Sequence, residues 1–428
     1  MSHRTIRRTP LAVALAALTA AILVPPAFAA ADPAPAAASA ASASIPLIAR
    51  QVLFGNPERS GGAISPDGKW LGYVAPRDGV LNVWVAPADN PAAAKPITND
   101  RLRGIRGFSF AYDGKHVLYA QDEGGDENFQ VFAANLETAE SRALTKKGAR
   151  ADIAGLSPKH PGEVLVSVND RNPSYFDLVR VPLAGGEGTR LVENERFTGF
   201  TTDEDFALRF AETQTEDGGA QWFKREGDAW VEWSTVPQED SLTTRIAGFD
   251  AAGTTLFLVD SRGRDTGALF AIDTASGERR LVSEDPRADV DTVLTHPQTG
   301  AVQAVSVNFL KEEWTVIDPA IQPDVDALLK AADGGEFIVT SRTRDDSRWV
   351  VTLLRSNRSV EVVLYDRSTR TVAPWFDTRP ELPDDLLQRM HGVEITSRDG
   401  LVLPSYYTLP AGSDPDGDGK PNAPVPMV

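Results

Sequence analysis

Three aspartates near the carboxyl end of the chain are spaced as they are in metal-binding loops. The segment DPDGDGKPN places Asp414, Asp416 and Asp418 at every second position, followed by Gly419, like the opening of a calcium-binding loop. Such a loop also needs a bidentate glutamate at its twelfth position, and Val425 stands there. The sequence therefore favours a solvated turn, and no metal or other cofactor is expected.

The residues that nucleophilic acyl transfer by a serine requires are incomplete in this sequence. Acyl transfer requires a nucleophile beside a base and an oxyanion hole close to both. No Gly-x-Ser-x-Gly motif occurs, and the nearest string, ERSGGA around Ser60, lacks the glycine two places before the serine. The five histidines are scattered along the chain: His3, His116, His160, His296 and His391. The 428 residues alone are therefore predicted to be inactive, with no catalytic residue among them.

The amino end has the pattern of a secretory signal peptide. A basic start with three arginines precedes an apolar run from Leu11 to Val24 and the small-x-small sequence Ala27-Phe28-Ala29. The apolar run is too short to favour a membrane anchor. We therefore expect residues 1–29 to be removed from an exported protein, periplasmic or secreted, that is not inserted in a membrane afterwards.

Composition excludes several kinds of partner and chemistry. The hydrophobic share of 42% and the charged share of 24% are those of a globular protein. Removing residues 1–29 takes away three arginines and no acids, so the formal net charge falls from −17 to −20. Such an acidic surface repels nucleic acids and anionic membranes. The absence of cysteine excludes disulfides and thiol chemistry.

A short motif recurs at nearly constant spacing along most of the chain. ISPDGKWLGYVA at residues 64–75 is echoed by FAYDGKHVLYAQ at 110–121 and by FDAAGTTLFLVD at 249–260. The residues just before the turns lie 45 to 49 positions apart: Ser65, Ala111, Ser157, Thr202, Asp250, His296 and Asp345. Four short strands in about 45 residues form the blade of a β-propeller. We predict an all-β fold, namely a seven-bladed β-propeller over residues 45–378. The strand pattern is weakest in blades four and six. A pair of β-sandwiches is the alternative.

The regions on either side of this propeller differ from it. Residues 30–44 are rich in alanine, proline and serine, and we expect a disordered linker. Residues 379–428 begin with a connecting segment in which a short helix is expected near Pro383. Two strand-like runs joined at Asp399-Gly400 follow. They predict a hairpin that belongs to no blade.

Several stretches resemble the prolyl oligopeptidase family of serine peptidases, in its bacterial branch near the acylaminoacyl and dipeptidyl peptidases. They are ISPDGKWLGYVA, GGDENFQVFAAN at residues 124–135, and RPELPDDLLQRMHGVEITSRDGLVLPSYYTLPAG at 379–412. The resemblance implies an N-terminal fragment of such a peptidase. Residues 379–428 would begin an incomplete α/β-hydrolase catalytic domain, and the Ser, Asp and His triad would lie beyond Val428.

Two functions are open for the whole protein. The resemblance implies an exported serine peptidase that hydrolyses short peptides, in which the propeller gates access to its own catalytic domain. The alternative is a non-enzymatic TolB-like propeller that serves as a binding scaffold in the cell envelope. No helix with paired glutamates of the dipeptidyl peptidase kind is evident, so dipeptide specificity is not indicated.

Two loops carry the candidate substrate-facing residues. In the resembled family the catalytic domain lies over the propeller face that bears the loops between second and third strands. DEGGDEN at residues 122–128 and DSRGRDTG at 260–267 are such loops. Asp126 or Glu127, beside Asn128, could bind a substrate ammonium group, and Arg262 or Arg264 a carboxylate or carbonyl. Ordinary turn chemistry or interdomain salt bridges are the alternative.

Overall fold

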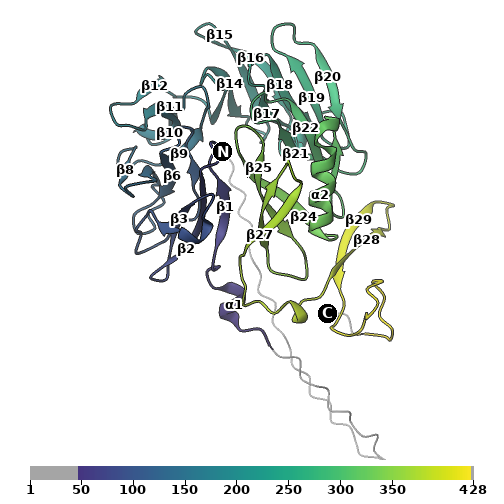
Figure 1. Cartoon of the computed structure of the whole chain (residues 1–428). Helices are drawn as coiled ribbons and strands as arrows, with labels where there is room; N and C mark the ends of the chain where they lie inside the picture. Colours follow the sequence, from purple (N-terminus) through teal and green to yellow (C-terminus); the bar gives the residue numbers. More distant parts are fainter. Residues whose placement is uncertain (1–46, 426–428) are drawn as a thin grey trace, which may run out of the picture. The chain divides into compact units, whose positions relative to one another are not determined.

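The computed structural model describes residues 47–425, and Figure 1 shows their helices and strands. The signal peptide and linker predicted for residues 1–44 lie outside the described residues. The described residues form one compact unit. Within the described part, no helix is both long enough and apolar enough to cross a membrane.

Seven small antiparallel sheets follow one another along the chain, each made of consecutive strands (Figure 1). A short helix, α1 (Arg50–Phe54), precedes the first sheet. Blade one contains β1 (Ser60–Ile64), β2 (Trp70–Arg77), β3 (Val80–Pro87) and β4 (Lys95–Pro96). Blade two contains β5 (Ser109–Phe110), β6 (His116–Gln121), β7 (Gln130–Asn135) and β8 (Ser141–Ala143). Blade three contains β9 (Ala151–Gly155), β10 (Glu163–Asn172), β11 (Tyr175–Pro182) and β12 (Thr189–Val192).

The remaining four sheets complete the propeller. Blade four contains β13 (Gly199–Thr202), β14 (Leu208–Gln214), β15 (Ala220–Glu226) and β16 (Ala229–Val236). Blade five contains β17 (Arg245–Phe249), β18 (Thr255–Asp260), β19 (Ala268–Asp273) and β20 (Arg279–Ser283). Blade six has three strands, β21 (Val290–Thr295), β22 (Val302–Asn308) and β23 (Glu312–Val316). Blade seven contains β24 (Glu336–Arg342), β25 (Arg348–Leu354), β26 (Glu361–Asp366) and β27 (Thr371–Asp377). The predicted seven-bladed β-propeller is confirmed.

The recurring Asp-Gly motif forms the turn between the first and second strands of a blade. In blade one, Asp67 accepts hydrogen bonds from the Ser65 hydroxyl at 2.7 Å and from the Lys69 N–H at 3.1 Å. Gly68 follows with a φ of +72°, a conformation that favours glycine. Asp113 repeats the contact in blade two, accepting from the Lys115 N–H at 2.8 Å. The repeat in the sequence is therefore a repeat of turn chemistry.

The ring closes between blades one and seven through packing and a few hydrogen bonds, one of them between the Arg344 N–H and the Pro66 carbonyl at 2.7 Å. No strand pair joins two blades in the described residues. In addition, the Ile64 N–H donates to the Ser341 hydroxyl at 2.8 Å, and the Thr340 hydroxyl donates to the Gly62 carbonyl at 3.1 Å. Apolar side chains of both blades, including Leu71, share one buried cluster beside these bonds. The closure therefore depends on packing and a few hydrogen bonds.

A helix that the sequence pattern did not predict follows β23 in blade six. After the short 3-10 turn η3 (Pro319–Ile321), α2 spans Gln322–Ala332. Its buried apolar residues, Val325, Leu328 and Ala332, lie on one face and pack against blade seven. A proline in the first turn suits a helix start, because its missing N–H would be unpaired there anyway. The helix stands where a fourth strand was expected.

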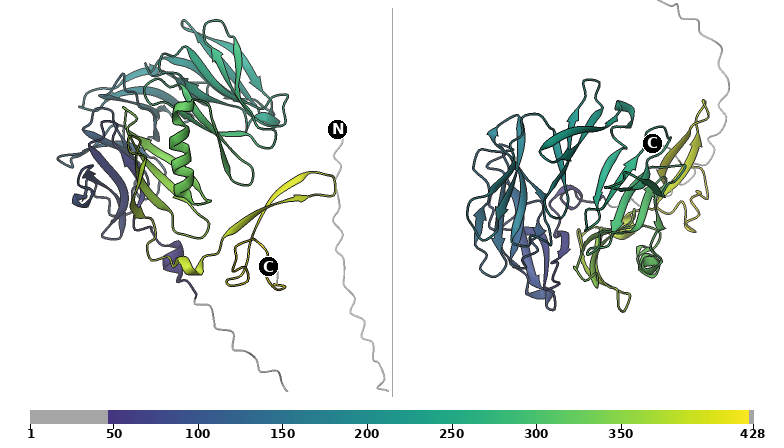
Figure 2. Two further views of the ribbon diagram at one scale, coloured as in Figure 1. Left: turned by 45° about the vertical axis from the view of Figure 1, so that its right-hand side comes forward. Right: turned by 90° about the horizontal axis from the view of Figure 1, so that it is seen from above.

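The polypeptide after blade seven forms the predicted hairpin, as a separate two-stranded sheet. The short helix expected near Pro383 is the 3-10 turn η4 (Asp384–Leu386). β28 (Met390–Thr396) and β29 (Val402–Thr408) follow and pair along their whole length. Figure 2 shows that the hairpin extends away from the blades. Most of its side chains, including Ile395 at 50% exposure, face solvent.

Candidate functional site

One face of the propeller carries the loops between second and third strands. Because each blade is antiparallel, the first strand begins and the fourth strand ends at this same face. We call it the connection face. The chain enters the propeller there at Ser60 and leaves it at Asp377, and α1 and the hairpin segment therefore adjoin it. Arg379 joins the two ends, donating to the carbonyls of Val52 and Gly55, each at 2.8 Å.

The loop of residues 122–128 lies on the connection face, between β6 and β7, as predicted. The Asp126 carboxylate accepts from the Asn128 N–H at 3.0 Å and from the Glu123 N–H at 3.3 Å. The first of these bonds is the main reason that the pKa of Asp126 is lowered. Glu127 has a φ of +60°, and its N–H donates to Asp122 at 3.3 Å. Asp126 and Asn128 thus hold the loop, and the Glu127 side chain makes no ion pair within residues 47–425.

Arg262 lies in the corresponding loop of blade five, between β18 and β19. Its guanidinium donates to the Asp260 carboxylate at 2.8 and 2.9 Å, to the Ser234 hydroxyl, and to the Thr235 carbonyl at 2.9 Å. Arg279 contacts the same carboxylate at 2.8 Å. Burial alone would raise the pKa of Asp260, but the bonds from Arg262 and the charges of both arginines lower it to about 2. Arg262 therefore holds its own loop, and a contact with substrate stays a prediction.

Arg264 is more exposed than Arg262 and less strongly bound. It donates to the Glu284 carboxylate and to the Thr266 carbonyl at 3.3 Å, and its guanidinium lies 5.9 Å from the centre of the Phe270 ring. Blade two and blade five carry the two candidate loops, and no hydrogen bond or ion pair joins them in the described residues. The candidates from the sequence therefore lie on the predicted face without forming one cluster.

A groove of about 650 Å³ lies between the connection face and the hairpin. Loop residues of blades six and seven, such as Lys311 and Arg355, line one side, and Met390 and Tyr406 of the hairpin line the other. The Met390 N–H donates to the Ser356 hydroxyl at 3.0 Å. None of the predicted substrate-facing residues lines this groove. It shows how the hairpin meets the propeller.

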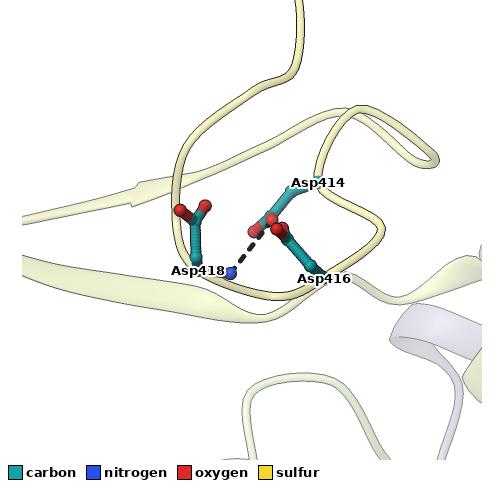
Figure 3. Close-up of side chains that lie close together, drawn as sticks. All are labelled: Asp414, Asp416 and Asp418. Atoms are coloured by element: carbon teal, nitrogen blue, oxygen red, sulfur yellow. Dashed lines mark hydrogen bonds between the residues drawn. The ribbon is translucent and has the colours of Figure 1, made fainter.

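The aspartates of the DPDGDG segment lie together in a loop after β29 (Figure 3). Asp414 accepts from the backbone N–H of Asp418 at 3.1 Å and of Gly419 at 3.0 Å. Carboxylate oxygens of Asp414, Asp416 and Asp418 lie within 4.8 Å of one another, a spacing that could hold a cation. The His391 ring nitrogen lies 3.6 Å from Asp414. The backbone contacts agree with a turn, and the expectation of no metal there stays a prediction.

The described histidines are engaged in local contacts. His116 lies 2.6 Å from Asp113 in a turn of blade two, and His296 accepts from the Gln298 N–H at 3.2 Å in a turn of blade six. His391 stacks on Tyr407. Within residues 47–425, no histidine nitrogen is hydrogen-bonded to a serine hydroxyl. The described part of the chain thus holds no serine–histidine pair of the kind that acyl transfer uses.

Solved structures define the class of protein to which this fold is similar. A prolyl endopeptidase superposes with a TM-score of 0.57 at 13% identity, covering 82% of this chain and 54% of that chain. Prolyl oligopeptidase B from Galerina marginata superposes with a TM-score of 0.55 at 14% identity, covering 84% and 56%. At these identities the likeness shows the fold, which is the propeller of the prolyl oligopeptidases.

Two curated proteins are similar to this chain in amino-acid sequence as well. The chain is 46% identical over 431 residues to dipeptidyl aminopeptidase BIII of Pseudoxanthomonas mexicana, covering 100% of this chain and 61% of that protein. It is 26% identical to dipeptidyl peptidase family member 6 of Caenorhabditis elegans, covering 90% of this chain and 55% of that protein. No family model matches the chain. The predicted resemblance to prolyl oligopeptidase-type peptidases is confirmed, and the chain spans less than two thirds of either relative.

Proposed function

We propose that this chain is the propeller portion of an exported serine peptidase that hydrolyses short peptides. The observation that carries the proposal is the alignment with dipeptidyl aminopeptidase BIII, which is 46% identical and covers both the propeller and the hairpin. The Ser, Asp and His triad would be supplied by polypeptide beyond Val428, within an α/β-hydrolase domain that residues 379–428 begin. The chain by itself would be inactive.

The hairpin supports this arrangement because it exposes apolar side chains on both strands. Ile395 in β28 is 50% exposed, Leu403 in β29 is 46% exposed, and Leu401 between the strands is 64% exposed. An isolated two-stranded sheet is marginal in water, and its apolar faces need a partner. Further strands of a catalytic domain would bury them. The paired ends of the propeller would place that domain over the connection face.

The propeller would then limit which substrates reach the catalytic centre. Its connection face carries polar loops such as residues 122–128, which a catalytic domain seated there would enclose. Short, flexible peptides could enter the enclosed space, whereas folded proteins could not. We further propose that Glu127, whose carboxylate makes no ion pair in the described residues, binds a substrate ammonium group.

The names of both curated relatives make dipeptide release the first activity to test. The coding sequence should be read beyond Val428, and its complete product purified. Chromogenic dipeptide substrates, a longer peptide and a folded protein would then be compared. The proposal expects hydrolysis of the short substrates and none of the folded protein.

Two results would overturn the proposal. A stop codon directly after Val428 would remove the source of the triad and leave the TolB-like scaffold as the better account. A complete product with the Gly-x-Ser-x-Gly motif that hydrolyses esters but no peptide would contradict the substrate class. Export has its own test, since the mature protein should begin near residue 30 and be recovered outside the cytoplasm.

A further inference from the structure

A second hollow, of about 460 Å³, opens on the connection face beside the loop of residues 122–128. The connections that lead into blades two and three line it, together with the end of β6 and Phe129, which directly precedes β7. The apolar part of its wall is formed by Phe108, Leu118, Phe129 and Ile153. The hollow therefore offers an apolar surface of side-chain size within reach of the candidate loop.

Three arginines surround this hollow: Arg103, Arg106 and Arg150. The Arg103 Nε lies 4.0 Å from an oxygen of Asp122, and the Arg150 Nε lies 4.0 Å from an oxygen of Asp152. Both distances are at the outer limit of an ion pair. The side chain of Arg106 makes no ion pair or hydrogen bond within residues 47–425.

This loose pairing differs from that of other arginines in the same chain. Arg262 binds its partner carboxylate at 2.8 and 2.9 Å and uses its remaining donors on neighbouring oxygens. The arginines of the hollow keep most of their donors free, although acids exceed bases by 17 in the chain. A guanidinium with free donors matches the two oxygens of a carboxylate. Although Asp122 and Asp152 also line the hollow, these free guanidinium donors beside an apolar wall match the chemistry of an anion that carries an apolar group.

We propose that this hollow binds the terminal carboxylate of a short peptide, through Arg103, Arg106 and Arg150, while the adjoining side chain packs on Phe108 and Phe129. The choice of a peptide rests on the proposed function. The site would hold the carboxyl end of a substrate or product, and Glu127 in the adjacent loop would remain available for an ammonium group.

Binding to this chain tests the proposal without any need for hydrolysis. Calorimetry would compare acetyl-Ala-Leu-Phe bearing a free carboxylate with the same peptide amidated at its carboxyl end. The site predicts at least about ten-fold weaker binding of the amide, since charge-assisted bonds to arginine are lost. An amidated peptide that ends in glutamate offers a side-chain carboxylate in place of the terminal one. If the hollow selects the terminal carboxylate, this peptide should bind less tightly than the free acid.

Arginine variants test whether the carboxylate binds in this hollow. The double variant Arg106→Gln/Arg150→Gln should weaken binding of the free acid at least about ten-fold and leave the amide unchanged. Arg101→Gln removes one positive charge, against two in the double variant, from an exposed neighbour that does not line the hollow, and it should change binding less than about two-fold. The thermal midpoint of both proteins should match that of the wild type, because Arg106 and Arg150 make no close ion pair.

Several outcomes would overturn the assignment. Equal binding of acid and amide, no binding of either at millimolar concentration, or an equal loss in Arg101→Gln would each do so. Tighter binding of inorganic phosphate than of the peptide acid would assign the hollow to a phosphate group instead. If the complete protein proved not to be a peptidase while this chain still bound the free acid, the proposed function would fail and the site would stand.

Discussion

Arg262 and Asp260 are held together within one loop of blade five by bonds of 2.8 and 2.9 Å. Asp260 is 2% exposed and also contacts Arg279. Arg262 further donates to Ser234 and Thr235 of blade four. The pair therefore fixes the connection between two neighbouring blades as well as the loop that bears it.

Loss of Arg262 should destabilise the propeller. Arg262→Gln leaves a buried carboxylate with one arginine instead of two, and we expect a cost of about 2–3 kcal/mol in the free energy of unfolding. Arg264→Gln in the same loop is the matched control and should cost about 0.5 kcal/mol, because its ion pair is partly exposed. Urea unfolding measures both. Equal costs would contradict the structural role of Arg262.

The same carboxylate makes stability depend on pH in acid. The pKa of Asp260 is lowered in the folded chain from 3.8 to about 2, so its stabilising effect is complete above about pH 4 and is lost as the pH falls toward 2. The wild type should therefore lose about 2 kcal/mol more than Asp260→Asn across this interval. Unfolding by urea at a series of pH values measures the difference. Parallel curves for the two proteins would contradict it.

The unpredicted helix should depend on one buried aspartate. Asp324 of α2 accepts from the Tyr365 hydroxyl at 2.8 Å and from Arg367 at 2.7 and 3.0 Å, both in blade seven. Asp324→Ala leaves the Tyr365 hydroxyl unpaired and leaves Arg367 with Asp346 as its remaining acid, and we expect a loss of about 3 kcal/mol. Asp326→Ala on the exposed side of the same helix should cost less than about 0.5 kcal/mol. A small effect at Asp324 would show that α2 is held by its apolar face alone.

Hydrogen exchange should separate the hairpin from the blades. Amides of β28 and β29 lie in a two-stranded sheet with exposed side chains, whereas β25 lies in the centre of blade seven. We expect protection at least about ten-fold lower in the hairpin of this chain. In a longer product that buries the hairpin, its protection should rise toward that of β25. High protection in the shorter chain would contradict the proposed missing partner.

Much of the fold follows from the sequence because the propeller repeats its turn chemistry. Asp67 and Asp113 make the same backbone contacts one blade apart, and this spacing alone indicates the blades. Helix α2 was missed because its apolar spacing lies where a fourth strand was expected. Its residues Val325, Leu328 and Ala332 do carry a helical period over about two turns.

The candidate site is less predictable, because side-chain partners come from different segments. Arg262 and Arg264 lie two positions apart in one loop, yet only the first binds a buried carboxylate. The arginine hollow combines Arg106 with Arg150, 44 positions later in the sequence. Their separation is close to the blade repeat, and both lie in connections that lead into a blade. That periodic position is the signal that could have brought them together.

The most direct test of the central claim is labelling by a fluorophosphonate probe, which reacts with an activated serine. The product of the coding sequence read beyond Val428 should be labelled stoichiometrically and should release dipeptides or other short products from peptides. The chain of 428 residues should remain unlabelled. Stoichiometric labelling of that shorter chain, or no labelling of a complete product that contains the missing motifs, would contradict the account.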